Sequence, residues 1–235
     1  MSSFISCEEL CLSFPSEPII SFRSFIAGLG RQKNNKQFTV LDRINLTCEP
    51  GDRVALVGAN GSGKTTLLRI LARIYHPTSG NFSSVGSIST MFSLTSGMEL
   101  ELSGRENIYQ KFSLMGFDPK FAKRHLDYVV DFSELEKFID HPIRIYSSGM
   151  LMRLAFSVAT VVECDILLMD EWLAVGDSSF SEKAQQKLNE LIDRIEIFVI
   201  ATHSQDLANN VCNKKLHLNN GKIVKTEIIS RDVAS

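Results

Sequence analysis

The stretch GANGSGKTTLLRIL, residues 58–71, is the strongest indication of the fold of this chain. Its first eight residues match the pattern G-x-x-x-x-G-K-[ST], in which Gly58 and Gly63 flank four variable positions and Lys64 and Thr65 follow. The hydrophobic run RVALV precedes the pattern and an apolar helical run follows it, so it lies between a predicted strand and a predicted helix. This is the context that a phosphate-binding loop requires.

The residue types of this stretch suit phosphate binding. Glycines let consecutive backbone N–H groups curve around phosphate oxygens, and the N-terminus of the following helix adds a positive dipole end. Lys64 reaches the terminal phosphates of a nucleotide, and Thr65 supplies a hydroxyl ligand for magnesium. A glycine-rich turn that only closes a helix–sheet unit is the alternative, but the strand–helix context favours nucleotide binding.

A second group of candidate residues ends or follows buried strands. Asp170 ends the apolar strand DILLMD and is predicted to hold magnesium, while Glu171 is predicted to accept a proton from the attacking water. His203 follows the strand IFVIAT and is predicted to contact the γ-phosphate. Acidic residues often end strands and lone histidines are often structural, but the phosphate loop upstream favours the catalytic reading.

The remaining pattern is that of an α/β protein. Helices are predicted to begin at Ser103, where Glu106 completes a capping box, and at Asp118 before Pro119. A β-hairpin is predicted around Asn220-Gly221. The other predicted strands are Phe38–Cys48, Arg53–Gly58, 87–92 and Ile197–Thr202. We therefore expect a core sheet flanked by helices, an antiparallel β component and a helical insert.

Composition limits the partners of this chain. The 235 residues are 44% hydrophobic, and the formal net charge of -2 gives no general electrostatic reason to bind nucleic acid or an anionic membrane. The five cysteines have no metal-type spacing, so we expect them reduced and buried, in the cytoplasm. We find no signal-peptide pattern and no run of about 18 apolar residues. We therefore expect another chain to cross any membrane at which this protein works.

A third group of residues opens the segment YSSGMLMRLAFSVATVVECD, residues 146–165. Ser147 and Ser148 are good N-cap residues for a helix. The apolar residues of that helix fall on one stripe: Leu151, Leu154, Ala155, Val158, Ala159 and Val162. Its N-terminus is a second candidate for phosphate binding, and a capped core helix without a ligand is the alternative.

These groups together resemble the ATP-binding cassette family, in which YSSGM stands in place of the signature L-S-G-G-Q. The resemblance covers nearly the whole chain. It implies a P-loop NTPase of the ABC nucleotide-binding-domain type, with a mixed core sheet flanked by helices, an antiparallel β subdomain and an α-helical subdomain. It also implies one domain over residues 1–235, with the core at about 1–92 and 164–235 and the helical subdomain at about 100–163.

The resemblance implies a role for each candidate residue. Phe14 matches the aromatic residue that lies against adenine, Asp177 the aspartate that contacts the second subunit, and His203 the switch histidine. The implied catalytic residues are Glu171, His203 and Lys64, and the implied ligands of Mg2+ are Thr65 and Asp170. The residues implied to bind ATP are Phe14, Gly58, Asn60, Gly61, Ser62, Gly63, Lys64, Thr65, Thr66, Ser147, Gly149 and Asp177.

Finer features look like the ATPase subunits that export polysaccharides, the O-antigen and capsule group: SGRENIY, DEWLAVGD and LARIYHPTSG. They imply a homodimer that sandwiches two Mg-ATP and drives two copies of an integral membrane permease, which handles a lipid-linked glycan. They imply no nucleic acid partner and a peripheral place on the cytoplasmic face of the bacterial inner membrane. The alternatives are a capsule or teichoic-acid exporter, a soluble cassette ATPase outside transport, and a P-loop kinase.

Three features depart from this pattern or are left open by it. Most cassettes have a glutamine within residues 86–101, and here Ser93 or Thr95 stands near that place. The loop Ser16–Gln37 ends basic, and we expect it to reach toward the membrane or the permease unless it is a solvated excursion. The sequence ends soon after the hairpin, so we expect the form without a C-terminal carbohydrate-binding domain and without sugar affinity of its own.

Overall fold

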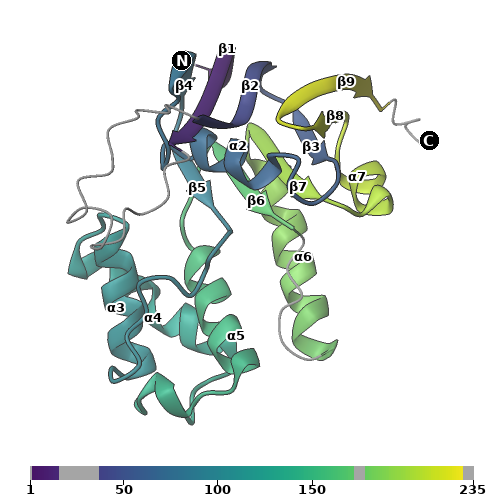
Figure 1. Ribbon diagram of the computed structural model, residues 1–235. Helices are drawn as coiled ribbons and strands as arrows, with labels where there is room; N and C mark the ends of the chain where they lie inside the picture. Colours follow the sequence, from purple (N-terminus) through teal and green to yellow (C-terminus); the bar gives the residue numbers. More distant parts are fainter. Residues whose placement is uncertain (1, 16–36, 172–177, 230–235) are drawn as a thin grey trace, which may run out of the picture. The chain divides into compact units, whose positions relative to one another are not determined.

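The computed structural model describes residues 2–15, 37–171 and 178–229 (Figure 1). The chain forms two compact units, residues 1–86 with 199–235 and residues 87–198. The subdomain boundaries expected from the sequence stay a prediction. The loop Ser16–Gln37 lies outside the described residues apart from Gln37, so its expected role also stays a hypothesis.

The first unit contains a three-stranded antiparallel sheet of order β2-β1-β4 (Figure 1). Its strands are β1 (Phe4–Pro15), β2 (Gln37–Cys48) and β4 (Ser79–Val85). The sequence pattern did not predict β1 or β4. In β1 the register shifts between Cys7 and Leu10, and Glu9 has a φ of 46°, so a bulge interrupts the alternation of buried and exposed residues. Strand β4, SGNFSSV, is nearly all polar.

The same unit contains four strands of a mixed sheet, in the order β7-β3-β8-β9. These are the final residues of β7 (Ile197–Thr202), together with β3 (Arg53–Val57), β8 (Lys214–Asn219) and β9 (Lys222–Ile228). Strand β3 runs parallel to β8, and β8 forms the predicted hairpin with β9. The turn residues Asn220 and Gly221 have positive φ of 47° and 75°, as a two-residue hairpin turn requires. Helices α2 (Lys64–Leu71) and α7 (Gln205–Val211) follow β3 and β7.

The second unit pairs two parallel strands with four α-helices. Strands β5 (Ile88–Thr90) and β6 (Ile166–Asp170) match the predicted strands to within two residues. The helices are α3 (Gly104–Leu114), α4 (Pro119–Ser133), α5 (Ser148–Ala159) and α6 (Ser178–Arg194), with a short 3-10 helix, η1 (Ile143–Ile145), before α5. The two predicted caps are confirmed: Ser103 and Glu106 form the capping box of α3, and Asp118 caps α4 with Pro119 in its first turn.

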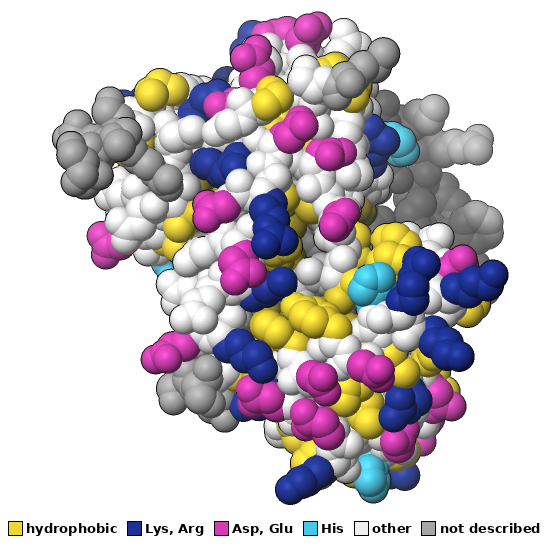
Figure 2. Space-filling view, turned by 180° about the vertical axis from the view of Figure 1, so that it is seen from behind, with side chains coloured by type: hydrophobic (Ala, Val, Ile, Leu, Met, Phe, Trp, Pro, Cys, Tyr) yellow, Lys and Arg dark blue, Asp and Glu magenta, His cyan; other side chains and the backbone are white. Residues whose placement is uncertain are grey.

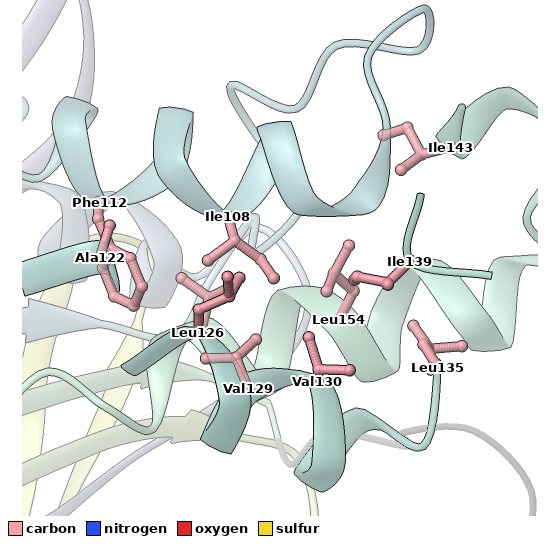
Figure 3. Packing of buried hydrophobic residues seen from close by; sticks show 11 residues of the cluster. Ile108, Phe112, Ala122, Leu126, Val129, Val130, Leu135, Ile139, Ile143 and Leu154 are labelled. Carbon is pink, nitrogen blue, oxygen red and sulfur yellow. The ribbon is translucent and has the colours of Figure 1, made fainter. Parts of the chain in front are cut away.

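Side chains from α3, α4 and α5 form the hydrophobic core of this unit (Figure 3). Ile108 of α3 and Leu154 of α5 are fully buried in it, with Val129 of α4 between the helices. The predicted stripe on α5 is confirmed at Leu154, Ala155, Val158 and Ala159, which are buried, but Val162 lies beyond the end of the helix. In the second half of α5 every side chain from 154 to 159 is buried, including those off the stripe. Helices on several sides surround that half, so periodicity no longer separates an inner from an outer face.

The distribution of surface charge and the burial of the cysteines can be compared with what the composition predicts. Acidic and basic side chains alternate over the face seen in Figure 2, with hydrophobic side chains between them. All five cysteines are free as expected, but Cys11 and Cys164 are only half-buried, whereas the other three are buried. Within residues 2–15, 37–171 and 178–229, no helix combines the length and hydrophobicity needed to span a bilayer.

Candidate nucleotide-binding site

The glycines of the phosphate loop lie where side chains have no room. Gly58 follows β3 directly, and a Cβ on it would lie 2.3 Å from the carbonyl oxygen of Leu218 and 2.8 Å from Ser62 Oγ. A Cβ on Gly63 would lie 2.8 Å from the Leu41 side chain, and its φ is 107°. The backbone contact excludes a side chain at Gly58, and the positive φ strains any other residue at Gly63, so the loop backbone follows a path that favours glycine at both positions.

Two polar side chains inside the loop suit a phosphate group. Lys64 is 9% exposed, and its Nζ donates to the carbonyl oxygens of Gly58 at 2.8 Å and Ala59 at 3.1 Å. Ser62 Oγ is buried and has no hydrogen-bond partner in the described part of the chain. An orphaned buried hydroxyl is rare in proteins, and this one is free to donate to a bound group. A phosphate oxygen beside both groups would accept from the hydroxyl and pair with the ammonium.

The first turn of α2 leaves backbone donors for a ligand. Gly63 occupies the N-cap position in the left-handed conformation and supplies no side-chain cap. The first N–H groups of a helix lack intrahelical acceptors, and among the described residues no side-chain cap bonds to this end of α2. Thr65 and Thr66 lie in this turn and are half-buried, while Asn60 and Gly61 are exposed on the loop.

The β8–β9 hairpin braces the phosphate loop, which the sequence pattern did not reveal. The backbone N–H of Gly221 donates to the carbonyl oxygen of Ser62 at 3.0 Å, and its own carbonyl accepts from the N–H of Asp42 at 2.9 Å. A Cβ on Gly221 would lie 2.2 Å from the carbonyl oxygen of Val40. The Asn-Gly pair predicts a turn but not what the turn contacts, so Gly221 is an additional supporting residue of the site.

Phe14 presents an exposed aromatic ring at the end of β1. It is 40% exposed, and its ring meets Tyr75 edge-on with 5.8 Å between centroids. The Tyr75 hydroxyl accepts a hydrogen bond from Arg69 Nη1 at 3.3 Å. A partly exposed aromatic ring held by a neighbouring ring suits stacking against a planar base. Tyr75, which sequence reasoning missed, supports Phe14 in this position.

His203 is held in a short turn between β7 and α7. Thr202 before it is buried and its hydroxyl accepts from the N–H of Ser204 at 3.1 Å, while Ser204 caps α7 by accepting from the N–H of Leu207. The histidine itself is exposed. Because strands β7 and β3 are neighbours in the sheet, His203 and the phosphate loop follow adjacent strands of the first unit.

The predicted catalytic carboxylates lie at the end of β6 in the second unit. Residues 166–169 are buried, Asp170 is half-buried and Glu171 is exposed. Glu171 has a φ of 68°, which is uncommon outside glycine and marks a turn at this strand end. Asp177 lies outside the described residues, so its predicted contact with a second subunit stays a prediction.

The signature residues open α5 as predicted. Ser147 is the N-cap and accepts from the N–H of Met150 at 3.2 Å. The Tyr146 hydroxyl before it donates to the carbonyl oxygen of Phe138 at 2.8 Å, and burial raises the pKa of Tyr146 to about 12. A cavity of about 370 Å³ opens here, lined by Glu134, Leu135, Phe138, Ser147, Gly149, Met150 and Arg153.

The predicted site is therefore divided between the two units. The first holds Phe14, residues 58–66 and His203, and the second holds Ser147, Gly149, Asp170 and Glu171. Among the described residues, no three His, Cys, Asp or Glu side chains form a metal cluster. Magnesium in a nucleotide site usually takes one or two protein ligands along with phosphate oxygens and waters. The Thr65 hydroxyl in the first unit and the Asp170 carboxylate in the second are each oxygen donors of the kind that magnesium takes.

Comparisons with known proteins show the family to which the chain is similar. The family model described as ABC transporter matches residues 41–174. The chain is 44% identical to the O-antigen export system ATP-binding protein RfbE of Yersinia enterocolitica over 79% of its length and 77% of that protein. It is 37% identical to the teichoic acids export ATP-binding protein TagH of Staphylococcus haemolyticus, over 82% and 72% of the two chains.

A solved structure shows the same fold. The structure of the ATP-binding cassette MJ0796, described as a dimeric post-hydrolysis state bound to ADP and Pi, superposes with a TM-score of 0.73. The match covers 97% of this chain and 99% of that chain, at 19% sequence identity. The predicted fold class, a P-loop NTPase of the cassette type with a mixed sheet, an antiparallel sheet and helices, is confirmed.

Proposed function

The chain belongs to the ABC transporter family, and on this premise we propose that it is the ATP-binding and ATP-hydrolysing subunit of a polysaccharide exporter. Its substrate is ATP, and the energy drives export of a lipid-linked glycan, O-antigen, through a separate membrane permease. The phosphate loop carries the ATPase assignment, because Ser62 Oγ has no described partner and Lys64 Nζ contacts only loop carbonyls. Similarity to the O-antigen export protein supports the assignment of O-antigen as the exported glycan.

The residues divide the chemistry among them. Lys64 and the loop N–H groups bind the β- and γ-phosphates, and Phe14 stacks on the adenine. Glu171 accepts a proton from the attacking water, and His203 contacts the γ-phosphate. Thr65 and Asp170 would hold Mg2+, which would neutralise charge on the phosphate oxygens. Phosphoryl transfer depends on positioned charge. In these roles the residues bind, orient and exchange a proton, and none of them forms a covalent bond with the phosphate.

In this proposal each nucleotide site is formed by residues from two copies of the chain. The N-terminus of α5 is a second phosphate-binding end, remote in sequence from the phosphate loop. Ser147 and Gly149 of one chain meet the nucleotide that the other chain holds, and Asp177 contacts the second chain. The homodimer thus binds two ATP molecules and docks from the cytoplasmic face of the bacterial inner membrane on two permease copies, which handle the glycan. No nucleic acid takes part.

A teichoic acid is the second candidate cargo. The chain is also similar to the ATP-binding protein of a teichoic acid exporter. The residues assigned to ATP do not distinguish the two polymers, because they contact only the nucleotide. The distinction therefore depends on the permease and on the polymer that the cell makes.

Enzymology and genetics together test the proposal. The purified chain is expected to release phosphate from Mg-ATP, and Lys64→Ala to abolish that release. In the bacterium, deletion of the gene should leave the lipid-linked glycan inside the cell, and the wild-type gene but not Lys64→Ala should restore it to the surface. Normal surface glycan in the deletion strain would contradict the transport role, and a chain without ATPase activity would contradict the enzymatic one.

A further inference from the structure

Three helices of the second unit meet at one carboxylate. Glu134 accepts from Arg153 Nη1 at 3.1 Å through Oε2 and from Lys183 Nζ at 3.1 Å through Oε1. Glu134 is the C-cap residue of α4, Arg153 lies in α5 and Lys183 lies in α6. We call these three residues the Glu134 cluster. The cluster plays no part in the chemistry described above.

Aromatic rings hold the two cations of the Glu134 cluster. The Arg153 guanidinium lies 4.8 Å from the ring centre of Phe180, and Lys183 Nζ lies 4.8 Å from that of Phe132. Lys183 also donates to the carbonyl oxygen of Phe132 at 3.0 Å, and the Phe132 and Phe180 rings meet edge-on at 5.8 Å. The Arg153 side chain is only 15% exposed. Glu134 and Lys183 are 46% and 37% exposed, so the pairs contribute through their shared network and the packed rings, not through burial.

The backbone of Glu134 does not favour a glutamate. Its φ of 59° and ψ of 39° place it in the left-handed conformation at the end of α4. Glycine and asparagine are the residues that this cap position prefers, and other residues lose about 1–2 kcal/mol there. A glutamate therefore costs stability at this position, and its carboxylate is the group that offsets the cost.

The Glu134 cluster joins two segments that the proposed function uses. Arg153 follows the signature residue Gly149 by about one helical turn and lines the same cavity as Ser147 and Gly149. Lys183 lies near the start of α6, the first helix after Glu171 in the chain. One carboxylate thus holds the signature helix to the helix that follows the catalytic glutamate.

We propose that Glu134 is a positioning residue for ATP hydrolysis, which fixes α5 and α6 relative to one another so that the signature end of α5 keeps a productive position against α6. The inference rests on the proposed function. It concerns the hydrolytic step and not the capture of nucleotide, because the phosphate loop that binds ATP lies in the other unit. Loss of the carboxylate therefore lowers kcat and leaves the KM for ATP nearly unchanged.

The variant Glu134→Asn tests this role, because asparagine suits the left-handed cap while it removes both ion pairs. We expect kcat to fall on the order of tenfold or more, as small errors of position do in phosphoryl transfer, with a melting temperature equal to or above that of the wild type. Lys183→Met should give a similar loss of kcat, and the double variant should be no worse than either single one. A merely structural role would instead lower the melting temperature together with the activity.

A matched control lies on the same helix. Lys187 pairs with Glu190 at 3.7 Å on α6 and does not contact Glu134 in the described contacts, so Lys187→Met should retain wild-type kcat. Three results would each overturn the positioning role but leave the proposed function standing. They are wild-type kcat in Glu134→Asn, a rise in KM as large as the fall in kcat, and additive losses of kcat in the double variant. A wild-type chain that does not hydrolyse ATP would overturn the proposed function as well.

Discussion

Lys64 and Ser62 show how a few residues prepare a phosphate site before any ligand arrives. The lysine ammonium donates to two loop carbonyls, and the serine hydroxyl is buried without a partner in the described chain. A buried unsatisfied hydroxyl costs about 1–3 kcal/mol. Binding of a phosphate removes that cost and replaces neutral acceptors of the lysine by charged ones, so the loop gains more from ATP than from water.

Lys64→Ala and Glu171→Gln should fail in different ways. Loss of the ammonium removes a charge-assisted hydrogen bond to phosphate, so we expect ATP affinity to fall on the order of tenfold or more. Glutamine at residue 171 cannot accept the proton of the attacking water, so turnover should fall on the order of 100-fold or more while ATP affinity is kept. Equilibrium binding and phosphate release measure the two effects separately. Near wild-type turnover in Glu171→Gln would remove the base assignment.

Gly221→Ala should weaken ATP binding from outside the loop. Gly221 donates to the Ser62 carbonyl, and a Cβ would lie 2.2 Å from the Val40 carbonyl oxygen, so the hairpin must move and release the phosphate loop. Gly51→Ala is the control, because Gly51 also has positive φ, 93°, but nothing lies within 4 Å of its Cβ.

Both glycine variants should lose about 1–2 kcal/mol of stability through the strained φ. Only Gly221→Ala should also raise the dissociation constant for ATP, measured by calorimetric titration. Equal ATP affinity in the two variants would show that the hairpin does not support the loop.

At the scale of elements, α3 holds the segment in which the glutamine of most cassettes is missing. Lys111 is 9% exposed, and its Nζ donates to the carbonyl oxygens of Leu94 at 3.0 Å and Ser96 at 2.9 Å. Asn107 and Gln110, on the same helix face, hold residues 97–103. Which of Ser93 and Thr95 replaces the glutamine stays open, but both lie in a segment that α3 fastens.

Removal of the Lys111 ammonium should destabilise this segment. Lys111→Met keeps the length of the side chain but leaves two carbonyl groups without their donor, so we expect a loss of about 1–3 kcal/mol in the free energy of unfolding. Lys123→Met, at an exposed position of α4, should lose little. Chemical denaturation of both variants measures the difference, and equal stabilities would contradict the clamp.

The sheet of β1 and β2 should respond to alkaline pH. Burial raises the pKa of Cys7 and of Cys48 from 9.0 to about 12. The folded state therefore keeps protons that the unfolded state loses, so the stabilisation is complete below pH 9 and falls as pH rises toward 12. The slope is about 1.4 kcal/mol per pH unit for each thiol.

Urea denaturation at pH 8 and pH 10.5 checks this thiol effect. The wild type should lose more stability over that interval than a Cys7→Ala, Cys48→Ala double variant, which controls for the other groups that titrate there. An identical loss in the two proteins would show that the thiols do not contribute.

At the scale of the whole molecule, the proposed site is complete only when two chains meet. Each chain carries a phosphate loop at the start of α2 and, in the proposed function, a second phosphate-binding end at the start of α5. Glu171→Gln should therefore form a dimer in ATP and a monomer without it in analytical ultracentrifugation, since bound ATP is not consumed. Lys64→Ala should remain monomeric in both conditions. A Glu171→Gln chain whose sedimentation ignores ATP would contradict the half-site arrangement.

What the sequence determined by itself lies within short stretches of chain. The caps at Ser103 and Asp118 and the Asn220-Gly221 turn each depend on residues within four positions of one another, and the phosphate-loop pattern lies within eight consecutive residues. Their conformations follow from backbone sterics and local hydrogen bonds, so pattern and spacing were enough to predict them. The buried strands β3, β6 and β7 were predicted for the same reason, because their side chains are apolar without interruption.

Only the tertiary structure decided the features that join distant residues. The bulge in β1 and the polar strand β4 depend on their pairing with each other and have no periodicity of their own. The support of Ser62 by Gly221 and the contact of Glu134 with Lys183, 49 residues apart, depend on where whole strands and helices pack. Such contacts form only after the chain has folded around its core, so their partners cannot be read from either residue's neighbours in the sequence.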